Sequence, residues 1–91
     1  MTPSGDLVEG TIEKKTHQVM KNLREILNAS GVDFKDVVKT TIYLTDLSVF
    51  SKMNMVYAGY LKEPFPARET VEVKGLPRGA ELEISMIAIK K

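Results

Sequence analysis

The chain has no cysteine, no tryptophan and a single histidine, His17. Without cysteine it can form neither a disulfide nor a thiolate metal site, and a cysteine nucleophile is excluded. One histidine supplies neither a multi-histidine metal site nor the two-histidine pair of a ribonuclease within one chain. We therefore expect no metal site in this chain.

The sequence also lacks an excess of charge of either sign. Lysine and arginine together number 13, aspartate and glutamate 12, and the formal net charge is +1. Proteins that bind nucleic acids mainly by electrostatics carry a strongly basic face, so nucleic acid is not an expected partner. No apolar run reaches the roughly 20 residues that span a bilayer, and no signal-peptide core follows Met1. We expect a cytoplasmic protein with no membrane partner.

The 91 residues suffice for one small domain, residues 1–91. Residues 1–10 are expected to be a turn with a short extended piece. Apolar or small residues then recur with helical spacing, which predicts a helix over residues 12–30. Thr11 can cap its start, and Gly31 can end it.

Residues 37–44 are rich in β-branched side chains, which predicts a strand with Val38, Thr40, Ile42 and Leu44 on one face. Asp46 or Ser48 is expected to cap a second helix, and the prolines after residue 63 end it. The apolar stripe of this helix comprises Phe50, Met53, Tyr57, Tyr60 and Leu61.

Two further strands are predicted over residues 69–74 and 81–90, joined by a glycine- and proline-containing loop. Two amphipathic helices can cover only one face of this sheet, yet the last strand is apolar on both faces around Met86–Ile89. Self-association would bury the second face. The alternative is a partly solvated face with a few exposed isoleucines.

Arg68 and Glu83 are the main candidates for chemistry, and we expect them on neighbouring strands. The guanidinium of Arg68, held by a rigid Pro66-Ala67 entry, could bind a carboxylate or phosphate at two points. The alternative is a surface arginine paired with Glu69 or Glu72.

Glu83 lies in a strand that is otherwise nearly all apolar. If its face is covered, desolvation would suit the carboxyl to acid–base work, whereas a glutamate near a strand end can also reach water. Thr70 and Asn54 could add neutral hydrogen bonds to a ligand.

The chain resembles the RidA/YjgF family, also labelled L-PSP endoribonucleases or translation inhibitors. The resemblance covers nearly the whole chain, and its strongest parts are residues 36–44, 53–57, 65–68, 75–77 and 83–89. It implies a chorismate-mutase-like α+β fold with two helices packed on one face of the sheet. It also implies a homotrimer with ligand clefts between subunits.

The family resemblance implies a cofactor-free hydrolase. Such 2-iminobutanoate/2-iminopropanoate deaminases convert reactive imines or enamines into 2-oxo acids and ammonia. By resemblance, Arg68 holds the carboxylate of these small 2-imino or 2-oxo acids, and Glu83 activates the hydrolytic water. Asn54 and Thr70 match further substrate-binding positions.

The sequence departs from the family pattern in three places. Thr70 stands where cysteine is common, and Ser85 stands where glutamate is frequent. The family's first two strands have no counterpart, so the sequence predicts an N-terminally truncated form in which residues 1–10 are a remnant of the strand region. A non-catalytic regulatory module that binds small carboxylates, or an endoribonuclease and translation inhibitor, remains an alternative.

Overall fold

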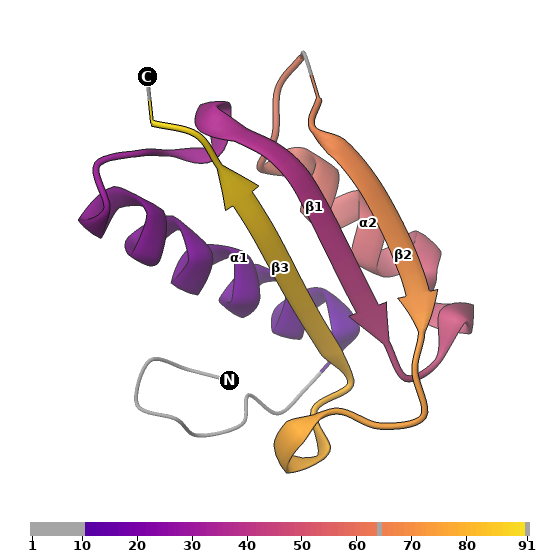
Figure 1. Ribbon diagram of the computed structural model, residues 1–91. Helices are drawn as coiled ribbons and strands as arrows, with labels where there is room; N and C mark the ends of the chain where they lie inside the picture. The colour runs from indigo at the N-terminus through magenta and orange to yellow at the C-terminus, as the bar shows by residue number, and fades with distance from the viewer. Residues whose placement is uncertain (1–10, 64, 91) are drawn as a thin grey trace.

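The computed structural model describes residues 11–63 and 65–90. Two α-helices and three strands make up this part of the chain (Figure 1). In chain order they are α1 (Ile12–Ala29), β1 (Val37–Leu44), α2 (Phe50–Gly59), β2 (Ala67–Glu72) and β3 (Leu82–Ala88). Short 3₁₀ turns precede β1, α2 and β3 at Phe34–Asp36, Leu47–Val49 and Pro77–Gly79.

The three strands form one sheet in the order β2-β1-β3. β1 and β2 are parallel because α2 carries the chain back across the sheet between them, and β3 is antiparallel to β1. Arg68 lies in β2 and Glu83 in β3, so β1 separates their strands (Figure 1). The expectation that these two residues lie on neighbouring strands is wrong.

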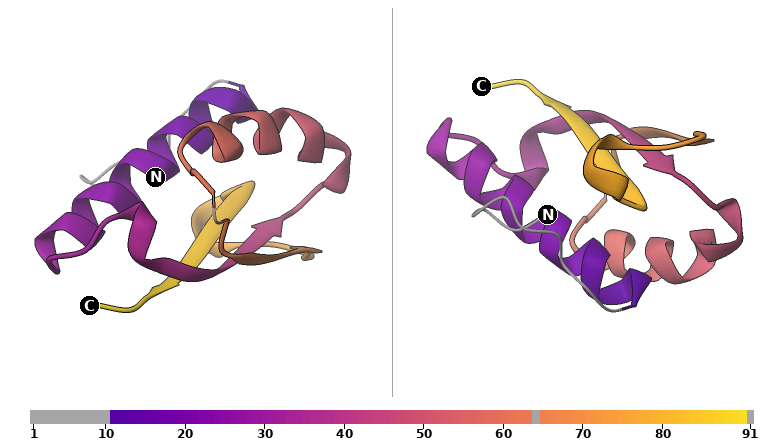
Figure 2. Two further views of the ribbon diagram at one scale, coloured as in Figure 1. Left: turned by 90° about the horizontal axis from the view of Figure 1, so that it is seen from above. Right: turned by 90° about the horizontal axis from the view of Figure 1, so that it is seen from below.

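Both helices pack on the same face of the sheet, and in the described part of the chain the opposite face has no covering layer (Figure 2). The hydrophobic core lies between the helices and the sheet. Met20 of α1, Ile42 and Leu44 of β1 and Met53 of α2 are fully buried there. The predicted α+β arrangement with two helices on one face is confirmed. The extended piece expected within residues 1–10 lies outside the described residues.

The sequence predicted the ends of α1 well. The Thr11 hydroxyl accepts a hydrogen bond from the backbone N–H of Lys14 at 3.2 Å, as an N-cap residue should. The helix ends at Ala29, one residue before the expected end, and Gly31 follows with a φ of +82°. A left-handed glycine suits the turn that leaves the helix. Neither α1 nor α2 is both long and apolar enough to cross a bilayer.

The start of α2 has a short 3₁₀ turn that the sequence did not reveal. Asp46 caps this turn, because its carboxylate accepts a hydrogen bond from the backbone N–H of Ser48 at 2.9 Å. This bond and a second one from the Ser48 side chain hold the pKa of the Asp46 carboxyl below its ordinary value. The α-helix proper then begins at Phe50.

A β-bulge interrupts β1 near its start. Val37 pairs with Ala88 and Lys39 with Ile87, so Val38 is the extra residue. Val37 is therefore buried, whereas Val38 is 42% exposed. The prediction that Val38 shares a face with Thr40, Ile42 and Leu44 was wrong, because strict alternation fails at a bulge. Thr40, Ile42 and Leu44 do share one face, and it is the buried one.

Because of the bulge, we expect the same valine-to-threonine substitution to lower the free energy of unfolding by different amounts at positions 37 and 38. Val38→Thr should change the free energy of unfolding by less than about 0.5 kcal/mol, as at other exposed positions. Val37→Thr should cost about 1–3 kcal/mol, because it buries a hydroxyl among apolar neighbours. Urea unfolding of both variants tests this, and equal costs would contradict the bulge.

Candidate functional site

Arg68 lies on the face of β2 that turns toward α2. Its Cα partner across the parallel ladder is Thr40, whose side chain is fully buried beneath the helices. The Arg68 guanidinium donates a hydrogen bond to Oδ1 of Asn54. Its central carbon lies 5.2 Å from the ring centre of Phe50 and 5.6 Å from that of Tyr57. One hydrogen bond and two cation–π contacts therefore orient this side chain.

The residues that hold Arg68 come from one face of α2. Phe50, Asn54 and Tyr57 follow spacings of four and three residues, which bring them above one another on a helix. The sequence identified Asn54 as a candidate but gave Phe50 and Tyr57 only a packing role. Their spacing around Asn54 was the signal that could have revealed an aromatic platform for a cation.

The carboxylates near Arg68 in sequence are occupied elsewhere. Glu69 forms an ion pair with Lys39 at 3.4 Å, and the Glu72 carboxylate accepts a hydrogen bond from the backbone N–H of Leu47 at 3.0 Å. The alternative of Arg68 as a surface arginine paired with Glu69 or Glu72 therefore receives no support. Its charge remains available for an external anion.

A cavity of about 350 Å³ lies beside Arg68. Its lining residues are Asn54, Tyr57, Ala58, Leu61, Phe65, Pro66 and Arg68. This volume suits a small molecule, and the walls are apolar apart from one guanidinium and one amide. Such a site could bind the carboxylate of a small acid at Arg68 and its short hydrocarbon part against the apolar wall.

Thr70 lies on the same side of the sheet as Arg68, two residues farther along β2. The structure thus brings three predicted site residues, Arg68, Asn54 and Thr70, to one region. Thr70 is partly buried and lies outside the cavity lining.

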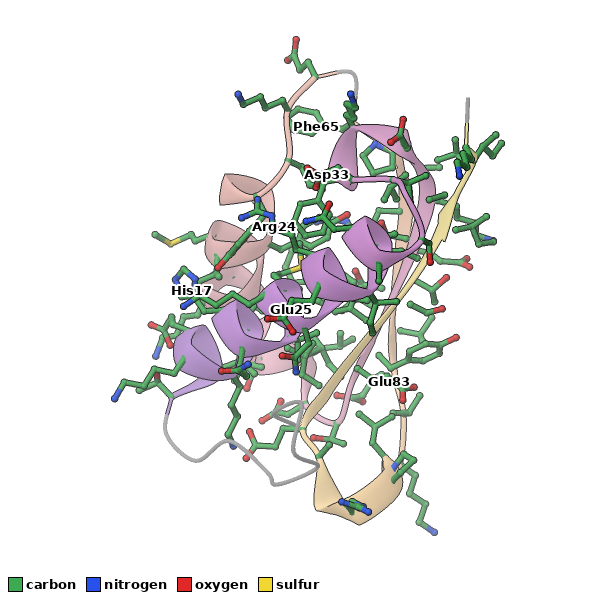
Figure 3. All side chains as sticks on the ribbon, turned by 90° about the vertical axis from the view of Figure 1, so that its left-hand side faces the viewer. His17, Arg24, Glu25, Asp33, Phe65 and Glu83 are labelled. Carbon is green, nitrogen blue, oxygen red and sulfur yellow. The ribbon has the colours of Figure 1, made fainter. Side chains whose placement is uncertain are left out.

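Glu83 lies on the opposite face of the sheet. It pairs with Tyr43 across β1 and β3, and both its neighbours in β3, Leu82 and Ile84, are buried on the helix side. Figure 3 shows Glu83 on the side of the sheet away from His17 and Arg24, which lie on α1. Within one chain, therefore, Glu83 does not meet Arg68.

The remaining titratable groups suggest no metal centre. Among residues 11–63 and 65–90, no three histidine or acidic side chains lie close enough to hold an ion. His17 is exposed on α1, where its Nδ1 lies 2.7 Å from the Tyr60 hydroxyl. This hydrogen bond gives His17 a structural partner on the outer side of the helices, apart from the cavity.

Comparison with known proteins places the chain in a family. A profile described as endoribonuclease L-PSP matches residues 1–90. The chain belongs to this family. The family includes proteins named RidA and YjgF, so the resemblance drawn from the sequence is confirmed.

The relatives of this chain include a human protein named 2-iminobutanoate/2-iminopropanoate deaminase. It is 45% identical over 87 residues, which cover 96% of this chain and 64% of the human protein. The structure of RidA from a Psychrobacter species has 41% identity and a TM-score of 0.87, over 93% of this chain and 68% of RidA. The Escherichia coli YjgF structure has 34% identity and a TM-score of 0.89. The match covers 98% of this chain and 72% of YjgF. The chain thus spans less than two thirds of the human relative.

Proposed function

We propose that the chain hydrolyses short 2-imino acids, or their enamine tautomers, to 2-oxo acids and ammonia. The observation that carries this proposal is the Arg68 guanidinium, held by Asn54 and two aromatic rings at the edge of a cavity sized for a small acid. The 45% identity to a protein named 2-iminobutanoate/2-iminopropanoate deaminase supports the choice of substrate class.

The reaction requires the protein to position the substrate and to supply one acid–base group. Arg68 binds the substrate carboxylate through two parallel hydrogen bonds and fixes the imine carbon nearby. Water adds to this carbon, and the resulting carbinolamine loses ammonia to leave the 2-oxo acid. A protonated imine is already electrophilic, so general-base help from Glu83 suffices to activate the water. No metal or organic cofactor is required.

The positions of Arg68 and Glu83 favour a site that two copies of the chain complete together. The two residues lie on opposite faces and on different outer strands, so one copy's Arg68 needs the Glu83 of another. The open face also exposes apolar side chains, with Ile87 at 57% and Val71 at 39% exposure. Burying them between copies would be favourable. We propose a homotrimer, because three copies make the smallest closed ring in which each copy has one partner for Arg68 and another for Glu83.

An assay of imine turnover tests the proposal. Freshly generated 2-iminobutanoate is mixed with the purified chain, and the formation of 2-oxobutanoate is followed against the buffer rate. We expect 2-oxobutanoate to form faster than in buffer, at a rate proportional to the protein concentration. A rate equal to that of buffer, from a folded and oligomeric sample, would contradict the proposal.

One observation favours a second function, a non-catalytic module that binds small carboxylates. The cavity, Arg68 and Asn54 all belong to one chain, whereas Glu83 does not reach them. A chain that does not assemble correctly would therefore bind without turnover. Calorimetry with 2-oxobutanoate distinguishes the two, because only the enzyme also accelerates hydrolysis. Ribonuclease activity gains no such support, since His17 is the single histidine and lies apart from the cavity.

A further inference from the structure

Three buried hydroxyl groups have no hydrogen-bond partner within residues 11–63 and 65–90. They are Oγ1 of Thr40, Oγ1 of Thr70 and the phenolic oxygen of Tyr57, and all three are sealed from solvent. Thr40 is fully buried, and Tyr57 is only 4% exposed. Buried hydroxyls are nearly always hydrogen-bonded in proteins, so each exception needs an explanation.

All three hydroxyl-bearing residues are neighbours of Arg68. Thr40 is the direct cross-strand partner of Arg68, and Thr70 follows on the same face of β2. The ring of Tyr57 lies 5.6 Å from the guanidinium carbon. The three hydroxyls without a partner thus belong to residues that adjoin Arg68 in the sheet or lie beneath its guanidinium.

Another buried threonine shows that the fold can satisfy such a group. The Thr16 side chain is also fully buried, and its hydroxyl donates to the backbone carbonyl of Ile12 at 2.7 Å. An unsatisfied hydroxyl lowers stability, and valine or phenylalanine would avoid this cost at the same positions. Three such destabilising groups near Arg68 indicate that the hydroxyls serve a purpose other than stabilising the fold.

We propose that Thr40 and Tyr57, together with Thr70, form a hydroxyl floor beneath Arg68 that hydrogen-bonds the carboxylate of the bound acid. This inference rests on the proposed carboxylate site and assigns it two further residues. A hydroxyl can accept a hydrogen bond from the guanidinium and at the same time donate its own proton to a carboxylate oxygen. The floor would supply neutral donors that Arg68 alone does not provide.

The contacts of Arg68 explain how a ligand reaches this floor. In the structure the guanidinium lies over Tyr57 and bonds to Asn54, and the hydroxyls are sealed from solvent. Arg68 is exposed and lines the cavity, so its side chain has room to turn toward an incoming carboxylate. Tyr57 itself lines the cavity, whereas Thr40 and Thr70 do not, so the proposal requires that the turn of Arg68 toward the carboxylate opens a path to these two threonines.

A purely structural role for these residues predicts a different outcome. A threonine retained for strand propensity, or a tyrosine retained for its ring, would leave ligand affinity unchanged when only the hydroxyl is removed. Thr40→Val and Tyr57→Phe remove the oxygen and keep most of the shape. Thr16→Val is the matched control, because it removes a buried hydroxyl that already has a partner.

The test measures two quantities on the full chain, the dissociation constant for 2-oxobutanoate by calorimetry and the midpoint of thermal unfolding. Thr40→Val and Tyr57→Phe should each weaken binding about tenfold, the effect of losing one hydrogen bond to a charged group. Their unfolding midpoints should stay the same or rise, since an unsatisfied buried group disappears. Thr16→Val should bind as the unchanged chain does and should unfold at the same or a lower temperature.

The outcomes separate this inference from the proposed function. Unchanged affinity in both floor variants, while Arg68→Ala abolishes binding, would overturn the hydroxyl floor and leave the carboxylate site standing. A lower unfolding midpoint in both variants would also overturn it, because the hydroxyls would then be stabilising the fold. If the unchanged chain does not bind 2-oxobutanoate at all, both the floor and the proposed function are wrong.

Discussion

Replacing Arg68 by alanine should lower kcat/KM for 2-iminobutanoate by roughly 100- to 1,000-fold, or about 2.7–4 kcal/mol of transition-state stabilisation. In the proposed site the guanidinium supplies the charge and the paired donors for the substrate carboxylate, and no other cation among the described residues lines the cavity. Arg68 is exposed on an outer strand, so its removal should leave the fold intact. Steady-state kinetics, with circular dichroism as a check on folding, measures this loss.

Arg68→Lys is the matched variant for this prediction. Lysine keeps the positive charge but loses the planar fork, so it should retain only part of the activity. Asn54→Ala should have a smaller effect than either change, because Asn54 orients Arg68 through one hydrogen bond. If Arg68→Ala hydrolyses the imine as fast as the unchanged chain, the cavity beside β2 is not the active site.

Replacing Glu83 by glutamine should lower kcat by roughly 100- to 10,000-fold, the range that a positioned general base contributes. Binding of 2-oxobutanoate should change little, because glutamine keeps the shape of the side chain and Arg68, not Glu83, holds the carboxylate in the proposed site. The two variants are therefore expected to differ in kind. Arg68→Ala loses binding, whereas Glu83→Gln keeps binding and loses turnover.

Glu81→Gln is a control for the Glu83 prediction. Glu81 is also exposed and lies two residues away, but it forms a surface ion pair with Lys15 at 2.8 Å. Surface pairs contribute little, so its activity should stay within about twofold. Equal activities of Glu83→Gln and Glu81→Gln would show that Glu83 takes no part in the reaction.

The sequence predicted the elements of the fold well where local physics determines them. The capping threonine and the left-handed glycine set α1 to within one residue. The β-branched residues of β1 and the apolar stripe of α2 gave the right elements, although the assignment of faces in β1 failed at Val38. Arg68 and Asn54 lie in contact in the structure, but their roles as substrate-binding residues came from the family resemblance and stay predictions.

Features that depend on tertiary pairing could not be predicted in this way. Strand order decides whether Arg68 and Glu83 are neighbours, and no local pattern distinguishes β2-β1-β3 from its alternatives. The bulge at Val38 depends on the register with β3. The aromatic platform under Arg68 required side chains of α2 to reach over β2, which local sequence patterns within either element do not show.

The most direct test of the account mixes two inactive variants. Arg68→Ala and Glu83→Gln are unfolded together in equal amounts, refolded, and assayed for 2-iminobutanoate hydrolysis. If each site takes Arg68 from one copy and Glu83 from the next, random assembly leaves about a quarter of the sites intact, and about a quarter of the normal activity should return. Activity no greater than that of the separate variants, from a mixed oligomer, would contradict a catalytic site shared between copies.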